Sequence, residues 1–130
     1  MGSEITALTV LILMQMVGSL VATAAVGQVV GAQWLLSSRN DEVSYRGSVG
    51  GRLDRARSNG FEAIILFAPA VLILAVTGTS TQSSVTAAWV FVGARMVYWL
   101  CYAADLVPWR TLVWFVGWLA LLWIVVTPML

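Results

Sequence analysis

Hydrophobic residues are grouped along this chain into four long runs, which shorter polar segments separate. The runs cover approximately residues 5–36, 52–76, 85–106 and 109–126. A helix needs about 20 mostly apolar residues to cross the hydrocarbon core of a bilayer, and each run is close to that length or longer. The pattern therefore predicts an all-α fold: residues 1–130 form a single four-span membrane domain, built as a four-helix bundle.

The polar segments predict the connections between these helices and their orientation. Residues 37–51 carry charged side chains and three glycines, which is typical of a surface loop. Cytoplasmic connections of membrane proteins carry an excess of positive residues. The arginines that lie at helix ends on one face are Arg39, Arg46, Arg52, Arg55, Arg57 and Arg110. We therefore expect an integral membrane protein of a bacterial inner membrane, with loop 37–51 and the break around Val107 cytoplasmic and both termini extracytoplasmic.

Composition narrows the chemistry that the chain can perform. The 130 residues are 60% hydrophobic and 10% charged, with no His, one Cys and a net charge of +1. Without His, and with Cys101 alone, the chain cannot form a Ser-His-Asp triad or a His/Cys zinc site, so we expect no metal centre. Its near-neutral charge does not favour a nucleic-acid partner. Every basic residue is Arg, which fits either bidentate recognition of an anion or Arg-rich codon usage.

Polar residues recur at helical spacing within two of the hydrophobic runs. At 100° per residue, each set lies on one side of its helix. One stripe is formed by Arg52, Arg55, Asn59 and Glu62, and the other by Arg95, Tyr98, Tyr102 and Asp105. A charge at mid-bilayer costs about 2.5–3.5 kcal/mol when it faces lipid, so both stripes should face protein or water. Asp54 and Arg57 fall off the first stripe and are expected to be solvated at the interface.

The two stripes contain more hydrogen-bond donors than one carboxylate can accept. An ion pair between Glu62 and an arginine would account for only two of these residues. The surplus indicates an anionic, hydrogen-bonding ligand that enters from the cytoplasmic side. Arg110 and Thr111 begin the fourth predicted helix, where free backbone N–H groups and the positive dipole end favour an anion. We expect Arg110 to stabilise a thiolate there, with the Thr111 hydroxyl or a tyrosine orienting the sulfur.

These motifs resemble the MAPEG superfamily, the membrane-associated proteins in eicosanoid and glutathione metabolism. The resemblance rests on the four-span layout, on Arg55-x3-Asn59-x2-Glu62, on Arg95-x2-Tyr98-x3-Tyr102, and on Arg110. It implies a homotrimer with glutathione, as cosubstrate, bound between subunits. The catalytic residues would be Arg110 and Thr111, and the glutathione-binding residues Arg52, Arg55, Asn59, Glu62, Arg95, Tyr98 and Tyr102. Relatives commonly have an arginine near the end of the first helix, where this chain offers only Arg39.

The resemblance implies a glutathione-dependent transferase or peroxidase that acts on a lipophilic, hydrophobic small molecule reaching the site through membrane lipid. Two other classes of function stay open at this point. One is a non-catalytic, trimeric lipid-binding or scaffold protein, because family membership does not establish an enzyme. The other is a small proton-coupled exporter that would use Glu62 as its membrane carboxylate.

Overall fold

The computed structural model describes residues 2–130 and consists of helices joined by short connections. The long helices are α1 (Ser3–Val30), α3 (Val49–Thr77), α4 (Gln82–Ala103) and α5 (Val107–Val126). The short ones are α2 (Ala32–Leu35) and the 3-10 helix η1 (Thr127–Met129). Residues 2–130 contain no β-strand. Since all four long helices are apolar and long enough to cross a membrane, the predicted all-α fold with four spans is confirmed.

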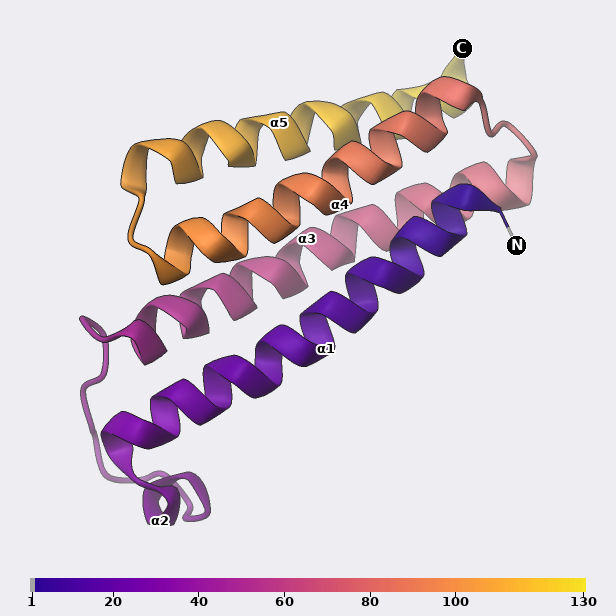
Figure 1. Ribbon diagram of the computed structural model, residues 1–130. Coiled ribbons are helices and arrows are strands. Elements are labelled where there is room, and N and C mark those ends of the chain that lie inside the picture. The colour runs from indigo at the N-terminus through magenta and orange to yellow at the C-terminus, as the bar shows by residue number, and fades with distance from the viewer. Residues whose placement is uncertain (1) are drawn as a thin grey trace.

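The four long helices lie side by side as an antiparallel bundle (Figure 1). α1 packs mainly against α3, α4 packs mainly against α5, and α1 also contacts α4. Both termini lie at one end of the bundle, and α2 and the α4–α5 corner lie at the other (Figure 1). The hydrophobic core, which includes Leu11, Phe67, Leu74, Phe91 and Ile124, lies in the half nearest the termini. The predicted polar stripes therefore belong to the opposite half, which this core does not fill.

The first helix is shorter than the hydrophobic run predicts. α1 ends at Val30 rather than near residue 36, because Gly31 has a φ of +88°, which glycine adopts easily but an α-helix does not contain. The four-residue α2 follows as a separate helix. Arg39 lies beyond it, donates to the Leu35 carbonyl at 3.0 Å, and has its guanidinium 5.7 Å from the Trp34 ring centroid.

α3 and α4 begin earlier than predicted because polar side chains cap their first turns. α3 starts at residue 49 rather than 52, and the Ser48 hydroxyl accepts a hydrogen bond from the Gly51 N–H at 3.1 Å. α4 starts at residue 82 rather than 85, where Thr81 and Ser84 each accept the other's backbone N–H. These caps satisfy N–H groups that a helix leaves without internal partners.

The corner between α4 and α5 also differs from the prediction. α4 ends at Ala103 rather than residue 106, so Asp105 lies outside the helix and does not extend the second polar stripe. Asp105 has a φ of 58°, a left-handed conformation that aspartate tolerates better than most residues. α5 begins at Val107 rather than residue 109, because Pro108 fits the first turn of a helix.

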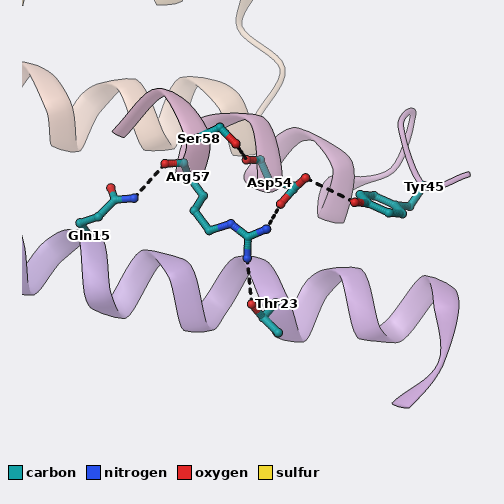
Figure 2. Close-up of polar contacts among 6 residues, drawn as sticks. All are labelled: Gln15, Thr23, Tyr45, Asp54, Arg57 and Ser58. Carbon is teal, nitrogen blue, oxygen red and sulfur yellow. Dashed lines mark hydrogen bonds and ion pairs between the residues drawn. The ribbon is translucent and has the colours of Figure 1, made fainter. Parts of the chain in front are cut away.

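A partly exposed polar network joins α1 to α3 (Figure 2). The Arg57 guanidinium forms an ion pair with Asp54 and donates to the Thr23 hydroxyl at 3.0 Å. The buried Gln15 amide donates to the Arg57 carbonyl at 2.8 Å, and the Tyr45 hydroxyl donates to Asp54 at 3.4 Å. Asp54 and Arg57 are thus paired with each other and partly exposed, at 23% and 30% of their side-chain surface, where the sequence predicts solvated charges.

Gly50 sets the close approach of α3 to α1. A Cβ atom at this position would lie 2.8 Å from backbone atoms of Ala25 and Val26, which cannot rotate away. We expect Gly50→Ala to lower the free energy of unfolding by about 1–3 kcal/mol, measured by denaturant unfolding in detergent. Gly93→Ala is the matched control, because nothing lies within 4 Å of its Cβ position. It should be neutral or stabilise by about 0.5–1 kcal/mol; equal losses in both variants would contradict the role given to Gly50.

Candidate functional site

Two adjoining cavities lie between α3, α4 and α5, and Tyr98 and Trp114 line both of them. The larger cavity has a volume of about 260 Å³ and the smaller one about 210 Å³. The larger cavity is lined by Asn59, Glu62, Ala63, Leu66, Phe91, Ala94, Arg95, Tyr98, Val113, Trp114, Gly117, Trp118 and Leu121. The smaller cavity is lined by Tyr98, Tyr102, Arg110, Thr111 and Trp114. Seven of the nine predicted site residues line at least one of these cavities, and the two that do not are Arg52 and Arg55.

The larger cavity is polar at one end and apolar at the other. Asn59, Glu62 and Arg95 lie in the halves of α3 and α4 nearer the α2 end, while Trp118 lies in the half of α5 nearer the termini and Phe91 belongs to the hydrophobic core. Such a cavity suits a ligand, or a pair of ligands, with one charged and one apolar part.

Arg95 is the charged residue that the fold buries most deeply at this site. Only 5% of its surface is exposed, and its Nη1 donates to the Asn59 side-chain oxygen at 2.8 Å. The guanidinium lies 4.3 Å from the Tyr98 ring centroid, a favourable cation–π distance. Its Nη2 atom is buried and has no hydrogen-bond partner among residues 2–130. Since buried donors are normally paired, this atom marks a position where an acceptor from a ligand would be stabilised.

Glu62 also lines the larger cavity, but it is exposed on the surface of the chain. The ion pair considered for Glu62 is not formed: within residues 2–130, the ion pair that the structure contains joins Asp54 to Arg57. The Glu62 carboxylate therefore keeps its capacity to accept hydrogen bonds from an ammonium or amide group of a ligand.

Arg110 and Thr111 lie in the first turn of α5 and face the smaller cavity together with two tyrosines. The Arg110 guanidinium is 4.7 Å from the Tyr102 ring centroid. The Tyr98 and Tyr102 rings contact each other edge to face, with centroids 5.1 Å apart. The structure thus brings the two predicted catalytic residues to the smaller cavity, which shares Tyr98 and Trp114 with the larger one.

Arg52 and Arg55 lie outside these two cavities, although the sequence places them on the same stripe as Asn59. The Arg52 Nε donates to the Tyr102 carbonyl at 3.2 Å, and its Nη2 donates to the Ala103 carbonyl at 3.4 Å. Arg55 donates to the Arg46 carbonyl at 2.9 Å. Both guanidinium groups therefore bind backbone carbonyls at the α2 end of the bundle.

The aromatic wall of the larger cavity is the part of the site that the sequence reasoning missed. Trp114 and Trp118 are one turn apart on α5, with ring centroids 5.7 Å apart, and Phe91 faces the same cavity from α4. Two tryptophans four residues apart lie on the same face of a helix, so this spacing predicts an aromatic face on α5. The tryptophan spacing does not stand out in the sequence, because apolar residues occupy nearly every position of this run.

A comparison with protein families tests the resemblance that the motifs indicate. The family model described as MAPEG family matches residues 4–130, which is essentially the whole chain, and the resemblance is confirmed. No curated protein and no solved structure matches the chain.

Proposed function

Since the chain belongs to the MAPEG family, an integral membrane family linked to glutathione and eicosanoid metabolism, we propose that it is a glutathione-dependent transferase or peroxidase acting on a lipophilic electrophile. The observation that carries this proposal is the buried Arg95, whose Nη2 lacks an acceptor within the described chain. The cavity beside it adjoins a second one lined by Arg110. Two cations at adjoining positions support a ligand with more than one negative group, as glutathione has in its carboxylates and its thiolate.

The polar end of the larger cavity offers a partner for each charged end of the tripeptide. In the proposed complex, Arg95 and Asn59 bind a carboxylate of glutathione, and Glu62 accepts hydrogen bonds from its ammonium group. The Tyr98 and Tyr102 hydroxyls donate to the peptide-like middle of the molecule. Arg55 joins the site by exchanging the Arg46 carbonyl for a carboxylate of the ligand.

The smaller cavity is where we place the sulfur. The thiolate is the nucleophilic form of a thiol, and the Arg110 guanidinium, together with the free N–H groups at the start of α5, stabilises its negative charge. Thr111 donates its hydroxyl to the sulfur. These groups act by positioning the thiolate and by stabilising charge, so no histidine base is needed.

The apolar end of the larger cavity is where we place the electrophile, against Phe91, Trp114 and Trp118. In a transfer reaction, the sulfur forms a bond to an electrophilic carbon, and the leaving group departs with its electron pair. In a peroxidase reaction, the sulfur attacks one peroxide oxygen and the other oxygen leaves as an alkoxide, which water protonates. A second glutathione then displaces hydroxide from the sulfenic acid and gives the disulfide.

The exposure of Glu62 supports a homotrimer. A carboxylate on an apolar helix is costly when it faces lipid, so a neighbouring subunit that covers this side of α3 would lower the cost. We also propose that loop 37–51 is cytoplasmic, because arginines are concentrated at that end, and that the membrane is a bacterial inner membrane. Native mass spectrometry should give three copies per particle, and a periplasmically active reporter fused to Leu130 should be functional. A monomeric particle or a cytoplasmic reporter contradicts these assignments.

Two measurements on the purified chain in lipid nanodiscs test the function most directly. In a calorimetric titration, we expect saturable binding of glutathione. In a turnover assay, we expect formation of a conjugate with an aryl halide or of an alcohol from a lipid hydroperoxide. S-methylglutathione is the matched control, because it should bind without giving product. Absence of both binding and turnover would favour the scaffold alternative. The contacts of Arg39 with Trp34 and Leu35 also support that alternative, because they occupy the arginine that follows the first helix.

A further inference from the structure

Arg52 connects the start of α3 to the end of α4. Its three side-chain nitrogens donate to the carbonyls of Tyr102 at 3.2 Å, Ala103 at 3.4 Å and Gly47 at 3.4 Å. Tyr102 and Ala103 are the last two residues of α4. The last carbonyls of a helix lack their usual partners four residues on and carry the negative end of its dipole, although the Tyr102 carbonyl also accepts the Asp105 N–H at 3.3 Å. Arg52 therefore caps α4 from a different helix, with a charge of the favourable sign.

The Arg52 cap and the proposed position of the thiolate adjoin the same residue, Tyr102. The backbone of Tyr102 receives the Arg52 hydrogen bond, while the Tyr102 ring contacts the Arg110 guanidinium at 4.7 Å. Between α4 and α5 there are only residues 104–106. Because Asp105 in this corner has a left-handed backbone conformation, the corner follows a defined path. A shift of the end of α4 would therefore move both Tyr102 and the first turn of α5.

We propose that Arg52 is a positioning residue for Arg110 and not a ligand of glutathione. Its guanidinium holds the end of α4, and the end of α4 holds Tyr102 and the start of α5 in place. The consequence for catalysis rests on the proposed function, whereas the cap itself does not.

Hydrogen exchange of the protein without glutathione tests the cap. The Ala104 N–H bonds to the Leu100 carbonyl and the Leu106 N–H bonds to the Cys101 carbonyl, so these amides report on the end of α4. Arg52→Ala should speed their exchange roughly tenfold or more, because it removes hydrogen bonds from a charged donor. Arg46→Gln, on an exposed side chain, should leave their exchange unchanged. Unchanged exchange in Arg52→Ala overturns the proposal.

Glutathione titration and turnover then distinguish a positioning residue from a ligand. Arg52→Ala should leave the Kd for glutathione unchanged, and should lower both the ultraviolet thiolate absorbance of the complex and kcat, the latter by about 10–100-fold. Arg52→Gln keeps amide donors for the carbonyls but carries no charge, so it should recover part of the loss. Arg55→Ala, which removes a proposed ligand, should instead raise the Kd.

The remaining outcomes also distinguish a positioning residue from a ligand. A rise in Kd in both Arg52 variants, equal to that in Arg55→Ala, makes Arg52 a ligand and overturns the inference. If Arg52→Ala does not fold, the comparison of Arg52→Gln with wild type decides between the two roles. If the wild-type protein does not bind glutathione, the proposed function fails, and the exchange measurement still accepts or rejects the cap.

Discussion

Replacing Arg110 with alanine is expected to lower kcat by about 10²–10³-fold, while the Kd for glutathione changes little. The size follows from the loss of one preorganised group that stabilises a developing or full negative charge. Binding should persist, because the charged ends of glutathione are assigned to the larger cavity and only the sulfur to the smaller one. The ultraviolet absorbance of the thiolate should disappear from the complex at neutral pH.

Arg110→Lys and Arg46→Gln complete this experiment. Lysine keeps the charge but lacks the planar group that lies over the Tyr102 ring, so it should recover only part of the activity. The exposed Arg46 side chain lies at the same end of the bundle, and its replacement should leave kcat unchanged. Wild-type turnover in Arg110→Ala would remove this residue from the mechanism.

Replacing Arg95 with methionine is expected to weaken glutathione binding by at least about 30-fold, since the loss of one partner of a buried charge pair costs about 2–5 kcal/mol. The same substitution should leave the free energy of unfolding of the ligand-free protein unchanged, or raise it. Arg95 is 5% exposed, and its Nη2 is unpaired within residues 2–130. Exchanging a poorly compensated buried charge for an apolar side chain of similar volume is often neutral or stabilising.

Unfolding by denaturant, with and without glutathione, measures both parts of this prediction in one series. Wild-type protein should gain stability from saturating glutathione, and the methionine variant should gain much less. Asn59→Leu is a useful companion, because it removes the Nη1 acceptor and should destabilise the ligand-free protein by leaving Arg95 with fewer partners. Loss of several kcal/mol in ligand-free Arg95→Met would instead make Arg95 a structural residue.

The sequence predicts the helices and much of the candidate site because both depend on local periodicity. Spacings of three residues place Asn59 with Glu62, and Arg95 with Tyr98, and the structure finds these pairs around one cavity. The helix ends were harder to predict, since hydrophobicity continues past Gly31, where the backbone leaves the helix. Helix caps such as Ser48 also depend on local sequence, but a single polar side chain is too little to locate the start of a helix.

Contacts between distant segments could not be predicted in the same way. Arg52, Asp54 and Arg57 lie within two turns of α3, and their neighbours depend on which helix covers each side. α4 ends beside Arg52, and α1 covers Arg57. Spacing along one helix fixes the direction of a side chain, but it does not identify the element that the side chain meets.

The main cluster of core side chains lies in the half of the bundle near the termini, and this uneven distribution has a mechanical consequence. Local opening requires least free energy where few apolar contacts are lost. At the α2 end, α3 meets its neighbours through mostly small buried side chains, among them Ala22, Val26 and Ala56, together with hydrogen bonds from Arg52 and Arg57. We therefore expect the α2 end to open more readily than the opposite end, so that exchange of bound molecules does not require the chain to unfold.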